Sequence, residues 1–283
     1  LEGNEIGWLK DYTDVPTLVG EDDSNNVSLV NNRITQVGED NGNPQIMDGI
    51  FQGSDLRVAG NEFSNIVLFT TASNSVIEGN QFVTIASLTV GTVAGTPVNA
   101  AIIASNKLAD ASGGTLTLYC HASTITGNST WNDSANPGTL LVQGMYNTIT
   151  GNESGATSIN GVRSTIQGNR FWGHLTLGSI NQTGGEFQVT GNILAPATGS
   201  PLDSDLIVGI LTPNCTLVGN RCRDLIVYHD LVGTVLVGNW VLRDIKTENG
   251  GVLPGYIAVG NRADNVFGFA KGNASIDEHN AEV

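Results

Sequence analysis

Two acidic residues occupy equivalent places in a repeated segment, and they are the first candidates for chemistry. Asp205 lies in SDLIVG and Asp224 in RDLIVY, at the same distance before a Gly-Asn dipeptide. Stacked on adjacent turns of a repeat structure, their carboxylates would lie about 5 Å apart. Repulsion between two such carboxylates raises the pKa of one carboxyl group or recruits a cation. A separation of about 5–5.5 Å is also that of the two catalytic carboxyl groups in retaining glycosidases. The predicted catalytic group is completed by Asp230 and His229, with Asp203 and Asp244 as further neighbours.

The same pattern also has a structural interpretation. Asp is a common turn residue at the start of a strand, where its side chain caps local backbone N–H groups. Arg221, Arg223 and Arg243 lie near the acidic residues in the sequence, but no motif assigns a role to any of them. The chain has no phosphate-binding glycine loop, no zinc-ligand spacing and no Ser/His/Asp order. The sequence therefore predicts no dedicated metal site.

Two tryptophans recur at one place relative to the Gly-Asn dipeptide. Trp131 and Trp172 each lie three residues after its Asn, and Gly155 holds the same place between them. Stacked on successive turns, the two indoles would lie roughly 10 Å apart on one outer face, where apolar rings with polar N–H groups suit a sugar chain. Asp133 and Arg170 are predicted to bind substrate beside them. In the structural alternative, the loop after Trp131 folds over that ring, and Trp172 caps a strand edge.

The Gly-Asn repeat specifies the elements that must position these side chains. The Asn follows a short β-branched run and recurs about every 23 residues, with intervals from 17 to 29. Its positions are Asn4, Asn32, Asn61, Asn80, Asn106, Asn128, Asn152, Asn169, Asn192, Asn220, Asn239 and Asn261. The residue three before it is nearly always aliphatic and the residue two after it is apolar or small, so strand alternation carries both into a core around a tight turn. Gly before the Asn suits positive φ, and Asn31 and Ser105 replace it in two repeats.

The repeated Asn is interpreted as a structural ladder. A buried amide must satisfy both its donor and its acceptor, and a stack of such amides can bond to one another and to the turn backbone. These Gly-Asn repeats with aliphatic stacks resemble the right-handed parallel β-helix proteins of the pectate-lyase-like superfamily, which includes polysaccharide lyases, epimerases and phage tailspikes. The resemblance covers essentially the whole chain and implies a fold, whereas the repeat marks no activity.

A second strand recurs in most repeats, as in GTLTLY and HLTLG, so two or three short strands close one coil. The predicted fold is all-β, a single right-handed parallel β-helix (a solenoid) of about twelve coils with an internal Asn ladder. Residues 1–270 are expected to form this one domain, and residues 271–283 a polar C-terminal tail. Because the repeat pattern already begins at Leu1 and solenoids need end caps, we expect the chain to be a segment of a longer protein.

Charge and composition restrict the partners. The chain carries 12 Lys and Arg against 27 Asp and Glu, a net charge of −15, which argues against nucleic acid and anionic membranes as partners. No apolar run reaches the roughly 18–20 residues of a membrane helix, so no membrane insertion is expected. Three Cys do not make a disulfide framework, and Cys215 and Cys222 are predicted to be small buried residues.

Two functions stay open on the sequence. One is an extracellular or virion-surface protein that engages polysaccharide or a cell-surface glycan, as tailspikes do, and cleaves it by hydrolysis or lyase chemistry at the acidic face. The other is a non-enzymatic structural or adhesive rod, such as a fibre or passenger segment. No cofactor is required, and calcium is the one that the acidic residues could recruit. Tailspikes are often trimers, so the resemblance allows a homotrimer, although the sequence specifies no three-fold interface.

Overall fold

The computed structural model describes residues 5–9, 17–20, 27–37, 39–40, 43–44, 47–51, 54–92, 97–109, 114–130, 138–178, 185–195, 205–208, 213–227, 233–247, 255–267, 274–278 and 281–282. These residues divide into two compact units, Leu1–Val142 and Gln143–Val283. Throughout the described ranges the secondary structure is all-β without a helix, as the sequence predicts. Accordingly, no apolar helix of membrane-spanning length is found in them.

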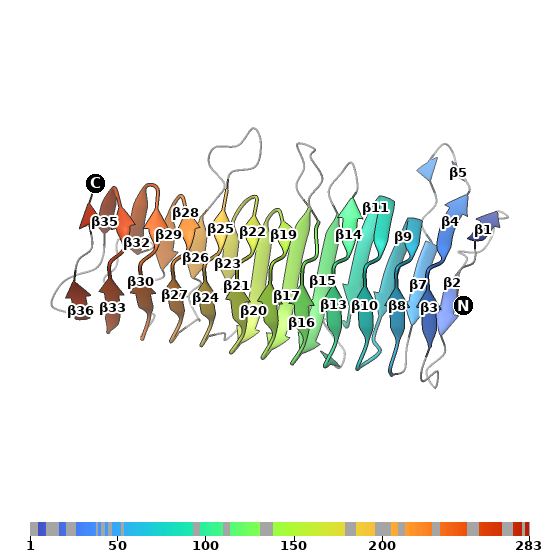
Figure 1. The fold of residues 1–283 in the computed structure, drawn as a ribbon, viewed down its shortest axis with the longest axis horizontal. Coiled ribbons are helices and arrows are strands. Elements are labelled where there is room, and N and C mark those ends of the chain that lie inside the picture. Colours follow the sequence, from blue (N-terminus) through green and yellow to red (C-terminus); the bar gives the residue numbers. More distant parts are fainter. Residues whose placement is uncertain are drawn as a thin grey trace. The chain divides into compact units, whose positions relative to one another are not determined.

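The first unit contains two sheets of parallel strands (Figure 1). One sheet holds the strands that precede the Gly-Asn turn: β3 (Ser28–Val30), β8 (Arg57–Ala59), β10 (Val76–Glu78), β13 (Ile102–Ala104) and β16 (Thr124–Thr126). The other holds β1 (Glu5–Leu9), β2 (Thr17–Gly20), β4 (Arg33–Val37), β7 (Met47–Phe51), β9 (Glu62–Thr70), β11 (Gln81–Val90), β12 (Val98–Asn99), β14 (Lys107–Ala109) and β15 (Thr115–His121). A short antiparallel pair, β5 (Glu39–Asp40) and β6 (Asn43–Pro44), lies apart from both sheets. The division between the units falls within β17 (Thr139–Met145).

The coils of the second unit have up to three short strands among the described residues, and these strands belong to three parallel sheets. The first sheet holds β18 (Thr148–Thr150), β21 (Thr165–Gln167), β24 (Gln188–Thr190), β27 (Thr216–Val218), β30 (Val235–Val237), β33 (Tyr256–Val259) and β36 (Ala274–Glu278). The second holds β19 (Glu153–Ser154), β22 (Arg170–Phe171), β25 (Ile193–Leu194), β28 (Arg221–Cys222), β31 (Trp240–Val241), β34 (Arg262–Ala263) and β37 (Ala281–Glu282). The third holds β20 (Thr157–Val162), β23 (Leu175–Leu177), β26 (Leu206–Val208), β29 (Leu225–Val227), β32 (Asp244–Thr247) and β35 (Asn265–Phe267). Strands β36 and β37 pair with β33 and β34, so parallel pairing continues into the segment predicted to be a tail.

A ladder of buried Asn side chains runs through each unit. The amide oxygen of Asn220 accepts hydrogen bonds from the backbone N–H and from Nδ2 of Asn192, at 3.1 and 3.0 Å. The second Nδ2 hydrogen of Asn192 goes to the carbonyl of Ile166 at 2.9 Å. The side-chain link repeats from Asn32 through Asn61, Asn80 and Asn106 to Asn128 in the first unit, and from Asn152 through Asn169, Asn192, Asn220 and Asn239 to Asn261 in the second. The predicted ladder is confirmed for these Asn, and Asn4 lies outside the described residues.

The two apolar columns around this ladder form the core. From Leu29 to Ala258, every residue three before a ladder Asn is buried, and the same holds two after it from Ile34 to Ala263. The residue before each ladder Asn has positive φ, and Asn31 and Ser105 adopt it as the glycines do, with φ of 54° and 55°. Stacked parallel strands with a buried Asn ladder make each unit consistent with a parallel β-helix. Cys120, Cys215 and Cys222 are buried and unbridged.

Candidate functional site

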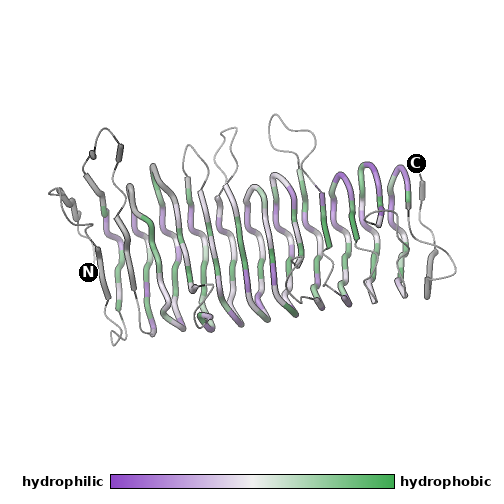
Figure 2. Tube along the Cα trace, turned by 180° about the vertical axis from the view of Figure 1, so that it is seen from behind, coloured by the Kyte–Doolittle hydropathy of each residue, from purple (hydrophilic) through white to green (hydrophobic). Residues whose placement is uncertain are grey.

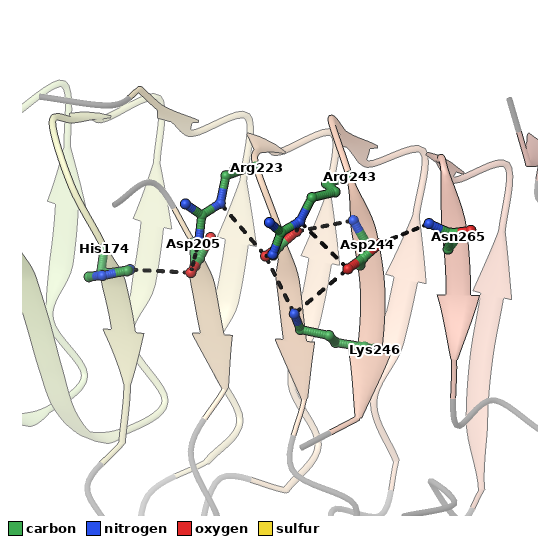
Figure 3. A network of polar contacts seen from close by, with 8 residues as sticks. His174, Asp205, Arg223, Arg243, Asp244, Lys246 and Asn265 are labelled. Atoms are coloured by element: carbon green, nitrogen blue, oxygen red, sulfur yellow. Dashed lines mark hydrogen bonds and ion pairs between the residues drawn. The ribbon is translucent and has the colours of Figure 1, made fainter. Parts of the chain in front are cut away.

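Polar side chains form a continuous column along the third sheet of the second unit. Leu175, Leu206, Leu225 and Ile245 hold equivalent places on successive strands, so the residues before them stack as well. Asn265 continues this row, because it pairs with Asp244. We call the resulting cluster the charged column: His174, Asp205, Asp224, Asp244 and Asn265, with Arg223, Arg243 and Lys246 between them. Figure 3 shows this network, with every member except Asp224 labelled.

Asp224 is the most heavily paired member of the charged column. Its side chain is 1% exposed. Arg243 donates from Nε to Oδ1 at 3.0 Å and from Nη2 to Oδ2, which makes a bidentate pair. The backbone N–H of Asp244 donates to Oδ1 at 3.1 Å, and Lys246 Nζ lies 3.4 Å from Oδ2. Both carboxylate oxygens are therefore saturated with donors.

Arg223 lies between the two predicted catalytic carboxylates. Its Nη2 donates to Asp205 Oδ2 at 2.9 Å, and its Nε lies 3.6 Å from Asp224 Oδ2. The Arg223 side chain is itself only 16% exposed. One guanidinium thus contacts both carboxylates from the space between them.

Asp205 is buried like Asp224 but has fewer partners. Its side chain is 7% exposed, and Oδ2 lies 3.6 Å from His174 Nδ1 as well as contacting Arg223. Its Oδ1 has no hydrogen-bond partner in the described part of the chain. At the other end of the column, Asn265 Nδ2 donates to Asp244 Oδ1 at 3.0 Å.

The two neighbouring carboxyl groups have oppositely displaced pKa values. Burial raises the pKa of Asp205, and the charge of Asp224 adds to this rise, while Arg223 and His174 oppose it. Burial also acts to raise the pKa of Asp224, but the hydrogen bonds from Arg243 and from the Asp244 backbone, with the charge of Lys246, lower it overall. The difference between the two pKa values follows from the number of hydrogen bonds that each carboxylate accepts.

This geometry restricts the chemistry that the charged column can perform. A retaining glycosidase places the scissile bond between its two carboxyl groups, and here that space is filled by Arg223. Calcium prefers six to eight oxygen ligands, whereas Asp224 already faces Arg223, Arg243 and Lys246. No cluster of three metal-ligating side chains occurs in the part of the chain that the structure describes. The described residues of the charged column therefore do not fit a calcium ion.

Trp172 and Arg170, both predicted to bind substrate, lie against each other on the second sheet. The Arg170 guanidinium carbon is 4.1 Å from the centre of the Trp172 ring, and the indole N–H donates to Glu153 Oε1 at 2.9 Å. Trp172 is half-buried. Its ring is held by charged neighbours on two adjacent strands. Its two predicted roles, a strand cap and a sugar platform, both stay predictions.

Five predicted residues lie outside the described ranges: Trp131, Asp133, Asp203, His229 and Asp230. The proposed pairing of Trp131 with Trp172, and the contribution of His229 and Asp230 to a catalytic group, thus stay predictions. A polar hollow of about 300 Å³ lies over the first sheet of the second unit, lined by Arg163, Glu186 and neighbouring polar residues. None of the predicted site residues lines it.

An exposed row on the second sheet was not predicted from the sequence. It consists of the residues directly after five successive ladder Asn, from Asn169 to Asn261, and the strand pairing aligns these residues on adjacent coils. On the preceding coil the same place is held by Glu153, which pairs with Arg170. We call it the alternating stripe: Arg170, Ile193, Arg221, Trp240 and Arg262. Trp240 is 47% exposed, and the guanidinium carbons of Arg221 and Arg262 lie 5.0 and 5.4 Å from its ring centre.

Comparison of the chain with protein-family models, with curated proteins and with solved structures gives no match. The class of protein therefore rests on the fold, which is consistent with a parallel β-helix in each unit.

The sequence contains the patterns behind both the charged column and the alternating stripe. Arg-Asp recurs at residues 223–224 and 243–244, and Arg or Trp follows the ladder Asn in four coils of the second unit.

Proposed function

We propose that the chain forms one right-handed parallel β-helix of about twelve coils that binds polysaccharide on its outer surface, in an extracellular or virion-surface setting. The observation that carries this function is Trp240, whose ring is nearly half exposed and lies between two guanidinium groups. Cation–π contacts restrain the ring before any ligand arrives. The exposed part of this restrained indole offers apolar ring carbons to the C–H groups of a pyranose.

We assign a structural role to the charged column, separate from the proposed binding surface. Its three carboxylates and three Lys or Arg side chains neutralise one another across adjacent coils. Asp205 and Asp224 are too buried to contact a polymer lying on the surface without rearrangement. We therefore propose binding without cleavage as the principal function.

Trp240→Ala tests the proposed binding. We expect the affinity for the bound polysaccharide to fall about tenfold or more, because aromatic anchors contribute above 1.4 kcal/mol when truncated at binding sites. Titration calorimetry against neutral and acidic polysaccharides measures this change. Ile102→Ala is the matched control, since Ile102 is similarly exposed, at 44%, but lies in the first unit. If the wild-type chain binds no polysaccharide, the proposal is wrong and the structural rod is favoured.

Glycan cleavage is the second candidate function, and one observation favours it. The pKa of Asp205 is raised and that of Asp224 is lowered, which is the split expected between a general acid and an ionised partner. We expect Asp205→Asn and Asp224→Asn each to abolish any release of new reducing ends by the wild-type chain. Circular dichroism would check that both variants fold. Wild-type chain that releases no reducing ends from acidic or neutral glycans would contradict this candidate.

A further inference from the structure

The alternating stripe changes chemical character at every coil. Along five adjacent strands of the second sheet, the exposed side chains are cationic, aliphatic, cationic, aromatic and cationic, from Arg170 to Arg262. Ile193 and Trp240, the two apolar members, are each 47% exposed. The row therefore alternates exposed apolar side chains with exposed cations along the sheet.

The stripe also holds the arginines that form no ion pair with any carboxylate that the structure describes. Five of the eight arginines form ion pairs with carboxylates: Arg33, Arg57, Arg163, Arg223 and Arg243. Arg170, Arg221 and Arg262 form none with any residue that the structure describes, and their ring contacts are with Trp172 and Trp240. In a chain of net charge −15, three guanidinium groups that lie on one row and have no ion-pair partner among the described residues favour an anionic ligand.

The spacing of these charges distinguishes between anionic polymers. Adjacent parallel strands lie about 4.8 Å apart, so successive arginines of the stripe recur roughly every 10 Å. A nucleic acid strand carries one phosphate about every 3.4 Å, and two of every three charges would face no cation on this acidic protein. An extended polysaccharide with an acid on alternate sugars carries one charge per disaccharide, which is comparable to the arginine spacing.

We propose that the alternating stripe binds a linear polysaccharide that carries an acidic group on every second sugar. The acidic groups pair with Arg170, Arg221 and Arg262, and the intervening sugars lie on Ile193 and Trp240. The polymer crosses the strands of the second sheet, over the part of the coils near the C-terminus where hydrophilic residues gather in Figure 2. This inference rests on the proposed polysaccharide binding and adds the site and the charge pattern of the ligand.

The test compares three probes: hyaluronan oligosaccharides with an acid on alternate sugars, polygalacturonate with an acid on every sugar, and uncharged dextran. Titration calorimetry is performed with the whole chain and with two triple variants. The first is Arg170→Gln with Arg221→Gln and Arg262→Gln. The matched control is Arg33→Gln with Arg57→Gln and Arg163→Gln, which changes the net charge equally but removes ion-paired arginines outside the stripe.

We expect hyaluronan to bind at least about tenfold more tightly than either other probe, and the stripe variant to lose this affinity while the control keeps it. Tighter binding of polygalacturonate than of hyaluronan would overturn the alternating pattern. Equal binding of dextran, or equal loss in both triple variants, would overturn the stripe as the site but leave polysaccharide binding intact. If no probe binds and a wider panel also fails, both this inference and the proposed function are wrong. Unfolding midpoints confirm that the variants fold.

Discussion

Two columns of polar side chains run along the second unit, and their stacked polar groups find bonding partners in different ways. In the Asn ladder, one residue type repeats on every coil, and each amide bonds to its own copy. In the charged column, Asp205, Asp224 and Asp244 also repeat on successive coils, but Arg223, Arg243 and Lys246 lie between them. Both columns contain buried polar groups, but only the charged column needs a second residue type, a cation, between its repeated residues.

The difference follows from the donors and acceptors of each side chain. A primary amide carries two N–H donors and an oxygen with two lone pairs, so identical amides satisfy one another without charge. A carboxylate has acceptors only, and stacked carboxylates repel. A repeated Asp on a parallel β-structure therefore requires a repeated cation beside it, which explains the Arg-Asp dipeptides at residues 223–224 and 243–244.

Asn220→Ala is expected to have the largest effect on stability. It removes the acceptor for the backbone N–H of Asn192 and the donor for the carbonyl of Val189, and both groups are buried. Each unsatisfied buried group costs about 1–3 kcal/mol, so the free energy of unfolding should fall by about 3 kcal/mol. Urea unfolding measured by circular dichroism checks this value.

The control for the ladder is Asn265→Ala in the charged column. Asn265 is exposed and donates a single side-chain hydrogen bond to Asp244. Exposed substitutions of this kind change stability by about 0.5 kcal/mol or less. Equal costs for Asn220→Ala and Asn265→Ala would contradict the view that the ladder is an internal structural element.

Asp224→Asn is expected to have an intermediate effect, and Asp205→Asn a smaller one. Removing one partner of a buried ion pair costs about 3–5 kcal/mol, and because Arg243 is 47% exposed, water offsets part of that loss. We expect Asp224→Asn to cost about 2 kcal/mol at pH 7 and Asp205→Asn less than about 1 kcal/mol, because Asp205 accepts fewer hydrogen bonds. A greater cost for Asp205→Asn would contradict the assignment of Asp224 as the anchor of the column.

The pH dependence of these two variants should have opposite signs. The lowered pKa of Asp224 means that its ionised form stabilises the fold above the ordinary Asp pKa of about 3.9, and that this contribution is lost as the pH falls through the folded-state pKa. The raised pKa of Asp205 means that its ionisation opposes folding above the folded-state pKa, and that this cost disappears in acid. Urea unfolding at pH 7 and pH 3 should therefore show the cost of Asp224→Asn shrinking in acid.

The repeat made much of the fold predictable. Each ladder Asn from Asn32 to Asn261 is buried as expected, and the turn before it has the predicted positive φ even where Asn31 or Ser105 replaces Gly. The core columns were equally readable, because strand alternation assigns every second residue to the interior. The second strand predicted in HLTLG, residues 174–178, is confirmed by β23 for the same reason.

The candidate site was less predictable, because a one-dimensional pattern does not show which side chains meet across coils. The sequence places Arg223 beside Asp224 in the chain, but its closest carboxylate contact is with Asp205 on the neighbouring coil. Likewise, Arg221 and Arg262 lie 19 and 22 residues from Trp240 in the sequence, and only strand pairing brings them to either side of its ring.

The sequence by itself determined the repeat, the turn conformation and the core residues of this protein. Those features depend on local φ preference, on strand alternation and on an amide that bonds to its own copy, all of which recur within one coil. Only the tertiary structure decided which charges are neutralised and which face the solvent. Ion pairing depends on the register between coils and on loops of unequal length, so Arg223 became a buried bridge while Arg221, two residues earlier, stayed exposed beside Trp240.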